Sequence, residues 1–589
     1  GRPCGGKEED DGSGTVHDLD KDALQIRLTE MHLGEACPRL AQAAEQGLDV
    51  RIAVERELDP AAVAGKAAEL DAARRLLETH AQAVRRKTPQ QVLGGIERHH
   101  LARLEHGDAP AQRLGLFQIM GGEQDGVTLL VQFGNEEPSI STKRAWVQFI
   151  LILTLAIILG RGGVQLRPIG IVDATAFSSL EQAPIVLNTA FTVLKTTDEG
   201  SAQLLQFHNQ NAMRELLPSK EGSPQSVLPK NTNVVVIIIE SFGTNYAGPN
   251  SPKSYTPFLD SLVEKGLFFD YAIANGRTSM DAVPAILAGM PSWLPESYIL
   301  SPYCSNQLNS LPQILKDQDY QTSFYHGAKE GSMSFKSFTK AIGVDTYKGL
   351  ESYPNQAHFD GNWGVWDHHM LSYFGKELSQ QQQPFFSSIF TLSSHHPYTV
   401  PASYEGKLKS GPEPLCKTIS YTDKALSRFF KRFQNKAWFK NTLFVITADH
   451  VGPTRQRKYQ TLDWRYRIPI AFYHPSEALP KPSKGVVFQQ IDIMPTVLDM
   501  LGLPKAVFQL GSSCFEHNQS KKMVYDNGNL LSFIYNGTNL IPIAWTPNVV
   551  RKYTQDQAQI SQQMSALYQH YMNSLIENRC SKQTIKSRF

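Results

Sequence analysis

The stretch Leu443-Phe-Val-Ile-Thr-Ala-Asp-His450 decides the fold, because an apolar run of strand length ends in an acidic residue and a histidine. An upstream run, Val234 to Ile239, is equally apolar and ends in Glu240. Two buried strands that deliver oxygen and nitrogen ligands at their carboxyl ends are typical of an α/β sheet with a site along one edge. The pattern predicts a divalent metal site made by Glu240, Asp449 and His450.

Further apolar runs support this architecture. Strand-like segments at 385–390 and 468–472 alternate with helical patterns at 256–265 and 491–501. The alternation predicts a mixed, mostly parallel central sheet flanked by helices on both faces, beginning near residue 234.

Length and composition bound the function. The chain has 589 residues and a formal net charge of +2, which is ample for two or more domains but excludes a polybasic nucleic-acid binder. The six cysteines are scattered, and none lies in a CxxC motif. Disulfides among Cys304, Cys416, Cys514 and Cys580 remain open at this level.

Residues 1–140 differ in composition from the rest of the chain, because Arg is preferred over Lys and Ala and Glu are abundant. Segments such as 61–75 predict helices with a modest apolar face. No chemistry is visible there, so we expect a helical region unrelated to the remainder of the chain.

A membrane anchor is expected at 145–165. The segment from Trp146 to Leu159 is almost entirely apolar, with Lys143 and Arg144 before it. The pattern predicts a span whose basic side faces the cytoplasm, with the long C-terminal part outside the membrane. The alternative is a buried core helix.

Between the two ligand-bearing strands lies Asn275-Gly-Arg-Thr-Ser-Met-Asp-Ala-Val-Pro284, which predicts a helix start with Asp281 as N-cap and Gly289 as the stop. Thr278 and Ser279 would lie just before the helix N-terminus, where backbone N–H groups favour an anion.

A hydroxyl beside a bound phosphate is a candidate nucleophile, since a divalent cation lowers the pKa of an oxygen bound to it. Arg277 is placed to clamp phosphoryl oxygens bidentately. The alternative for this segment is an ordinary polar N-cap turn.

Two histidines follow other predicted strands. His395 lies after the run at 385–390, and His326 follows the short run Phe324-Tyr325. Both are placed to donate to a phosphate oxygen or to shuttle a proton, or else are surface or core imidazoles without a role.

The motifs together resemble the lipoteichoic acid synthase-like branch of the sulfatase and alkaline phosphatase superfamily. They occur in the order Ile-Ile-Glu-Ser-Phe242, Gly-Arg-Thr-Ser279, Tyr-His-Gly327, Leu-Ser-Ser-His-His-Pro397 and Thr-Ala-Asp-His450. The resemblance implies an alkaline phosphatase/sulfatase-like fold and a membrane-anchored, extracytoplasmic phosphotransferase of the cell envelope. Such an enzyme moves a phosphoglycerol head group from a phospholipid to an acceptor glycan or glycerol phosphate.

The resemblance also assigns roles by motif. It implies a Mn²⁺ or Mg²⁺ site made by Glu240, Thr278, Asp449 and His450, with Thr278 as the nucleophile that forms a phospho-threonine intermediate. His326 and His395 match the substrate-binding histidines, which Arg277 would join. The mixed oxygen and imidazole set suits Mn²⁺.

One departure concerns the head group. In lipoteichoic acid synthases proper a Phe-Trp-Asn-Arg stretch follows the Tyr-His-Gly turn, whereas residues 328–335 here contain neither Trp nor Arg. Two alternatives therefore stay open: a phosphodiesterase- or sulfatase-type hydrolase, and an inactive surface protein with the same fold. No cysteine has the Cys-x-Pro-x-Arg context that ordinary sulfatases need.

The expected organisation has five parts: 1–140, the compositionally distinct region; 145–165, the membrane segment; 166–233, a juxtamembrane linker; 234–510, the catalytic domain; and 511–589, its C-terminal part or extension.

Overall fold

The computed structural model of the chain describes residues 16–20, 23–28, 49–54, 114–118, 128–132, 142–160, 169–187, 189–196, 203–217, 224–247, 254–481, 485–506, 508–516, 522–535, 540–547, 549 and 554–581. Two compact units divide the chain. The first comprises 1–119 with 125–141, and the second 120–124 with 142–589.

The described residues of the second unit form a seven-stranded sheet in the order β10-β9-β11-β6-β12-β13-β7. The five strands from β10 to β12 are parallel, whereas β13 runs antiparallel to both its neighbours. The predicted mixed, mostly parallel sheet is therefore confirmed. The strands are β6 (Asn233–Ile239), β7 (Leu267–Phe268), β9 (Gln321–His326), β10 (Thr346–Lys348), β11 (Phe385–Phe390), β12 (Thr442–Ala448) and β13 (Ile470–Tyr473).

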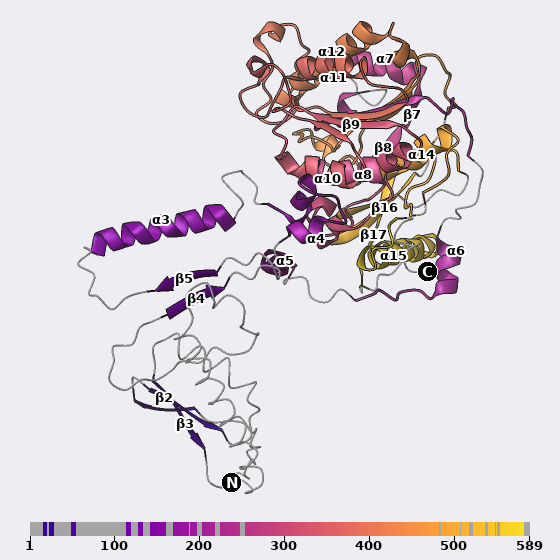
Figure 1. Cartoon of the computed structure of the whole chain (residues 1–589). Helices are drawn as coiled ribbons and strands as arrows, with labels where there is room; N and C mark the ends of the chain where they lie inside the picture. Colours follow the sequence, from indigo (N-terminus) through magenta and orange to yellow (C-terminus); the bar gives the residue numbers. More distant parts are fainter. Residues whose placement is uncertain are drawn as a thin grey trace. The chain divides into compact units, whose positions relative to one another are not determined.

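Helices cover both faces of this sheet (Figure 1). One face carries α7 (Pro257–Lys265), α11 (Asp367–Leu378) and α12 (Pro414–Phe433). The other carries α8 (Ser279–Ala288) and α10 (Phe335–Ala341). α14 (Ile493–Met500) packs beside α8. Because the central strands are buried on both faces, they read as continuous apolar runs rather than alternating ones.

The register of the two innermost strands positions the predicted ligands. In β6 and β12 every residue is buried, and the parallel pairing places Ile239 beside Ala448. Glu240 and Asp449 are the next residues along, so both lie at the same carboxyl edge. Parallel pairing thus converts two distant sequence motifs into neighbours.

The C-terminal residues add a three-stranded antiparallel sheet, β15-β16-β17, to the same unit. Its strands are β15 (Met523–Asp526), β16 (Asn529–Tyr535) and β17 (Leu540–Trp545), and α15 (Gln555–Ile576) contacts the last two.

A buried ion pair joins this sheet to the core. Lys522, just before β15, places Nζ 2.7 Å from Oδ2 of Asp492, which precedes α14. Both side chains are buried. The carboxylate also accepts hydrogen bonds from the backbone N–H groups of Gln489 and Ser512.

Part of 166–233, expected to be a linker, is packed against the domain. The hydroxyl of Thr175 donates to the carbonyl of Ser337 at 2.7 Å. The backbone N–H of His208, just before α6 (Gln210–Leu216), donates to Oε1 of Gln569 on α15 at 2.8 Å.

In the first unit, the prediction of a helical region is wrong for the residues that the structure describes. They form the short strands β1 (Val16–Asp20), β2 (Ala23–Leu28), β3 (Asp49–Val54), β4 (Leu114–Gln118) and β5 (Thr128–Gln132). Alternation such as Leu-Gln-Ile-Arg-Leu28 favours a strand locally despite a composition rich in helix formers. The helical segment predicted at 61–75 lies outside the described residues.

α3 (Thr142–Gly160) occupies most of the segment 145–165. No helix in the described part of the chain is long and apolar enough to cross a membrane, so the predicted span is not found. The 19 residues of α3 reach roughly 28 Å at 1.5 Å each, and its first turn holds Lys143 and Arg144. The alternative of a buried core helix is wrong too, since Trp146 is 61% exposed.

The question of disulfides is answered for the four described cysteines. None of Cys304, Cys416, Cys514 and Cys580 forms a disulfide among the described residues.

We expect Lys522→Met to destabilise the protein by roughly 3–5 kcal/mol, because it leaves the buried Asp492 carboxylate without its cation. Lys316→Met, which breaks an exposed pair with Asp345, is the control and should cost less than about 1 kcal/mol. Urea unfolding of the full chain measures both. Equal losses in the two variants would contradict a structural role for the buried pair.

Candidate metal and hydroxyl site

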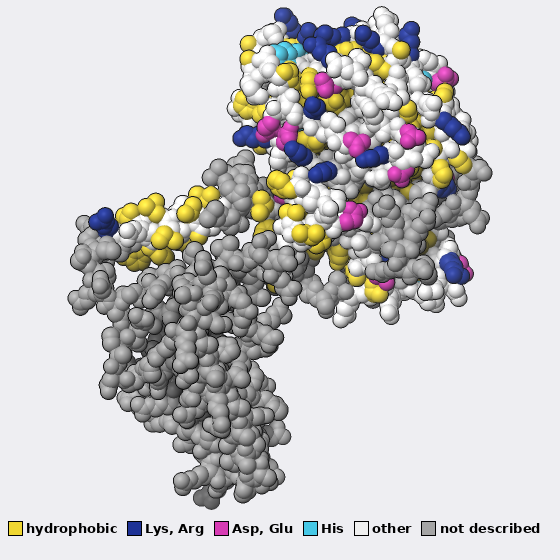
Figure 2. Space-filling view, viewed as in Figure 1, with side chains coloured by type: hydrophobic (Ala, Val, Ile, Leu, Met, Phe, Trp, Pro, Cys, Tyr) yellow, Lys and Arg dark blue, Asp and Glu magenta, His cyan; other side chains and the backbone are white. Residues whose placement is uncertain are grey.

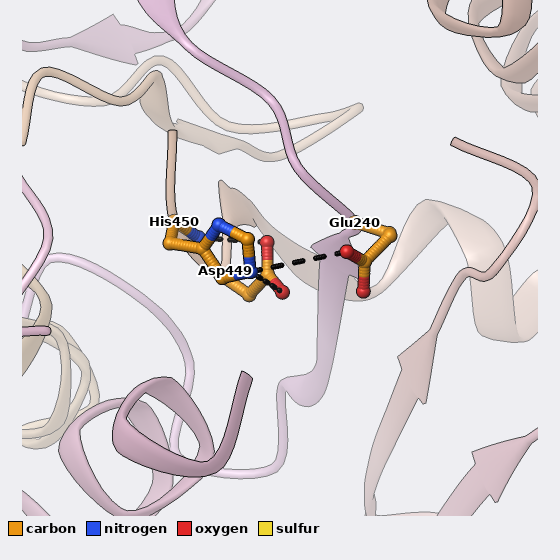
Figure 3. Close-up of side chains that lie close together, drawn as sticks. All are labelled: Glu240, Asp449 and His450. Carbon is orange, nitrogen blue, oxygen red and sulfur yellow. Dashed lines mark hydrogen bonds and ion pairs between the residues drawn. The ribbon is translucent and has the colours of Figure 1, made fainter. Parts of the chain in front are cut away.

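Glu240, Asp449 and His450 converge at the carboxyl ends of β6 and β12 (Figure 3). Each offers a ligand atom, and these atoms all lie within 4.8 Å of one another. Nε2 of His450 is 3.3 Å from Oδ2 of Asp449 and 3.9 Å from Oε1 of Glu240. Among the described residues, this is the group of acidic and histidine side chains with spacing suited to one metal ion.

The electrostatics of this cluster fit a cation. Glu240 and Asp449 are buried side by side, and burial, followed by the negative charge of Asp449, raises the pKa of Glu240 well above its ordinary value. Within the described residues, their ion-pair partner is the His450 imidazole, with no Lys or Arg within 4.0 Å. A divalent ion would supply the missing positive charge, and oxygen ligands with an imidazole suit Mn²⁺ or Mg²⁺.

Two backbone N–H groups and one serine hydroxyl hold the two carboxylates in place. Oδ1 of Asp449 accepts from the N–H groups of Ser241 at 2.8 Å and His450 at 2.7 Å. Oε1 of Glu240 accepts from the hydroxyl of Ser241 at 2.6 Å. Ser241 has a φ of 54°, a left-handed conformation uncommon for a non-glycine residue. The chain therefore turns sharply directly after Glu240.

The two hydroxyls at the start of α8 point to different partners. Ser279 Oγ donates to Oδ2 of Asp449 at 2.8 Å and lies 3.4 Å from Oε2 of Glu240. Thr278 Oγ1 instead donates to Oδ2 of Asp281 at 2.9 Å and lies 3.4 Å from Ser297 Oγ. The predicted nucleophile is thus exposed, whereas its buried neighbour contacts the ligand cluster.

The helix start differs by three residues from the predicted one. Thr278 is the N-cap, and Asp281 lies in the first turn, where its carboxylate accepts from the N–H groups of Arg277 and Thr278. This is a capping box, which the sequence spacing also permits. The predicted stop is confirmed, because Gly289 has a φ of 60° and ends α8.

Arg277 extends into solvent beside α8. Its guanidinium is 53% exposed and lies 3.8 Å from Oδ1 of Asp526. No hydrogen bond joins it to Glu240, Asp449 or His450 in the described part of the chain.

His326 ends β9 and is fully buried. Its ring packs against Phe390 and Phe335, with centroids 5.1 and 5.5 Å away. Burial lowers the pKa of His326 to about 3, so the imidazole is neutral at physiological pH. Nε2 has no hydrogen-bond partner among the described residues, which leaves a buried polar atom for an incoming group.

His395 lies on a half-buried loop after β11. Its ring centroid is 4.2 Å from that of Trp363, and Nδ1 is 3.0 Å from the carbonyl oxygen of His396. The loop begins at Thr391, whose hydroxyl accepts from the N–H of Glu240 at 3.1 Å. His395 is therefore connected to Glu240 through its loop and does not contact the candidate metal ligands directly.

Two supporting side chains were not identified from the sequence. The first is Asp367, at the start of α11, whose carboxylate accepts from the N–H groups of Leu392 at 2.8 Å and Ser393 at 3.2 Å. It also accepts from the hydroxyl of Thr422 at 2.8 Å. The local sequence around Asp367 carries no signal of this long-range role.

The second is Gln490, which bridges the two halves of the site. Its Nε2 donates to the carbonyls of Ala448 at 2.9 Å and Asp449 at 2.7 Å, and its Oε1 accepts from the N–H of Asn275 at 2.8 Å. Asn275 in turn donates to the carbonyl of Met523 at 3.1 Å. The segment bearing Thr278 and the strand bearing Asp449 are thus fixed to one another.

Comparison with known proteins confirms the resemblance seen in the motifs. Residues 232–503 match the family model described as Sulfatase. The Bacillus subtilis protein named lipoteichoic acid synthase-like YvgJ is 22% identical over 396 residues, covering 63% of this chain and 62% of that protein. Phosphoglycerol transferase I of Escherichia coli (strain 55989 / EAEC) is 26% identical, covering 56% of this chain and 44% of its own length.

Solved structures support the fold. The crystal structure of the lipoteichoic acid synthase LtaP from Listeria monocytogenes matches with a TM-score of 0.51 and 19% identity, covering 62% of this chain and 98% of that one. The chain spans less than two thirds of the length of the two curated relatives, at 62% and 44%.

We expect Mn²⁺ or Mg²⁺ to raise the melting temperature of the full chain, because the ion offsets the repulsion between two buried carboxylates. At a free metal concentration of 100 times Kd, the free energy of unfolding rises by about 2.7 kcal/mol. Asp449→Asn should lose most of this gain, whereas Asp556→Asn, on the exposed first turn of α15, should keep it. Thermal scans with and without metal measure the effect. An unchanged gain in Asp449→Asn would contradict a metal site at this cluster.

Proposed function

We propose that this chain, whose residues 232–503 carry a sulfatase domain, is a metal-dependent phosphotransferase. It would move a phosphoglycerol-type head group from a phospholipid to an acceptor alcohol. The observation that supports the proposal is the contact of Ser279 with both Asp449 and Glu240, because Thr278 is the adjacent residue and is exposed.

Thr278 would act as the nucleophile. Its hydroxyl is reachable from solvent and donates to Asp281, so this carboxylate is positioned to take the proton during attack. The bond from Oγ1 to phosphorus forms as the bond from phosphorus to the lipid oxygen breaks. The diacylglycerol oxygen takes up one proton as it leaves, which balances the proton that Asp281 received from Thr278. The acceptor hydroxyl later displaces the threonine from phosphorus and restores its hydroxyl.

The remaining residues would hold the reactants. Mn²⁺ or Mg²⁺ held by Glu240, Asp449 and His450, with the Thr278 oxygen as the fourth ligand that the motifs imply, would stabilise the negative charge that grows on the phosphoryl oxygens. The neutral His326, with its unpartnered Nε2, and His395 would contact the head group.

Arg277 would approach the phosphoryl oxygens from the exposed side. Because the proposed donor is a membrane lipid, we propose that the domain works at the extracytoplasmic surface of the cell membrane. Its acceptor would be a glycan or glycerol phosphate of the cell envelope.

A hydrolase is the second candidate, because the same residues would serve if water replaced the acceptor. The sulfatase family model supports this reading at the level of the domain. A formylglycine-dependent sulfatase is disfavoured, since no cysteine has the required sequence context.

We expect Thr278→Ala to lower turnover of a fluorescent phosphatidylglycerol by a factor on the order of 10³ or more, with the Mn²⁺-induced thermal gain retained. Ser279→Ala should keep the nucleophile but weaken Mn²⁺ affinity, with a loss of activity of roughly 10–100-fold. Intact-mass measurement followed by phosphopeptide analysis should show a phosphoglycerol adduct on Thr278 in the wild-type chain. The reverse pattern, with an active Thr278→Ala and an adduct on Ser279, would transfer the nucleophilic role to Ser279.

Transfer and hydrolysis are separated by their products. We expect the wild-type chain with Mn²⁺ and phosphatidylglycerol to form an acceptor-linked product when glycerol phosphate is added, and free glycerol phosphate only slowly without it. Chromatography of the labelled products measures both rates. Equal release of free glycerol phosphate with and without acceptor would identify a phosphodiesterase instead.

A further inference from the structure

A concave region lies between α11 and α12, with a volume of about 560 Å³. We name it the α11–α12 groove. It is lined by His368, His369, Ser372, Arg428, Phe429, Lys431 and Arg432. None of these residues belongs to the metal cluster or to the segment that carries Thr278, so the groove is a separate feature of the domain.

One wall of the groove is formed by α12, which lies in a basic segment of the chain. The segment 414–440 contains seven Lys or Arg residues and one acidic residue, Asp423, whereas the whole chain has 58 basic and 56 acidic residues. Asp423 does not offset this charge at the surface, because it is buried and accepts from the N–H groups of Phe258 and Leu259. Figure 2 shows Lys and Arg side chains gathered over the end of the domain where Figure 1 places α12.

The cations in the groove have neutral partners. Arg432 donates to the hydroxyl of Ser372 at 3.1 Å, and Arg428 donates to the hydroxyl of Tyr404. Across the described residues, no carboxylate lies within 4.0 Å of Arg428, Lys431 or Arg432. A guanidinium has five N–H donors, so most of the donors on both arginines stay available to a ligand.

The positive charge of Arg428 also contributes to lowering the pKa values of His368 and His369. Burial, with the positive charge of His369 and Arg428, lowers the pKa of His368 to about 3. Burial and the charges of His358 and Arg428 lower the pKa of His369 to about 4. The ring of His369 stacks on that of His358 with centroids 3.4 Å apart, and Nδ1 of His368 is held 2.6 Å from Tyr421 Oη. The wall opposite the arginines is therefore rigid and neutral.

The geometry suits a phosphate group. Arg428 and Arg432 are four residues apart on α12, so they project from one face of the helix, and Lys431 lies beside them. Two planar guanidinium forks match phosphate oxygens bidentately, and a lysine adds a point charge. The volume exceeds that of one phosphate and leaves room for an attached glycerol.

We propose that the α11–α12 groove binds the phosphate group of an anionic phosphodiester or phosphomonoester, at a site separate from the metal cluster. The ligand reaches it either as a lipid head group at a membrane surface or as a soluble ester. The inference rests on the groove alone and does not depend on the proposed catalytic function.

The test measures binding by the full chain in the presence of a chelator, so that turnover does not contribute. One arm uses free glycerol phosphate and calorimetry, and the other uses co-sedimentation with phosphatidylcholine vesicles with and without phosphatidylglycerol. We expect Arg428→Gln combined with Arg432→Gln to weaken binding at least tenfold. The control, Lys436→Gln combined with Lys440→Gln, removes the same charge from the same basic segment outside the groove and should change binding less than twofold.

The two arms identify the source of the phosphate. Loss of vesicle binding alone identifies a lipid head group, and loss of glycerol phosphate binding identifies a soluble ester; either result supports the site. Equal weakening in both double variants would reduce the groove to general electrostatic attraction and overturn the proposal. Unchanged binding in the arginine variant, or no binding by the wild-type chain in either arm, would overturn it as well. Unfolding curves and the metal-induced thermal gain verify that each variant is folded.

Discussion

The parallel pairing of β6 with β12 is the constraint on which the site depends. Because Ile239 lies beside Ala448, the residues that follow them, Glu240 and Asp449, place two carboxylates close together. Their burial makes the repulsion strong, because little water is present to screen it. The strands are held by fully buried apolar side chains, so the fold can sustain an unfavourable pair at their ends and present it to a cation.

The surrounding polar groups explain how this arrangement stays ordered. Gln490 fixes the strand end to the segment that begins at Asn275, and Asp367 fixes the loop that leads to His395. Each acts through backbone groups of another segment, so the site is assembled from five or more parts of the chain rather than from one motif. A loose ligand set would lose the spacing that a single ion requires.

The sequence predicted well where local pattern and burial agree. Apolar runs at 234–239 and 443–448 could be interpreted as strands, and the ligands that follow them lie where parallel pairing puts them. The different directions of Thr278 and Ser279 could not be predicted, because adjacent hydroxyls look alike in a sequence and only the capping box orients the first. The seclusion of His326 also depends on packing by Phe335 and Phe390, which lie in other elements. In the first unit, the composition rich in helix formers led to a prediction of helices, whereas the described residues form short strands.

The hydrogen bond from Asn275 to the carbonyl of Met523 connects the segment bearing Thr278 to a residue that lies far along the sequence, at the start of β15. Trp293, shortly after α8, donates to the same carbonyl at 3.0 Å. A ribosome makes residue 523 long after residues 275 and 293, so a nascent chain holding every ligand and both hydroxyls still lacks two of the bonds that secure this segment. These two bonds therefore form only after residue 523 has been made, and a chain that stops before it would carry the candidate ligands and both hydroxyls without this support.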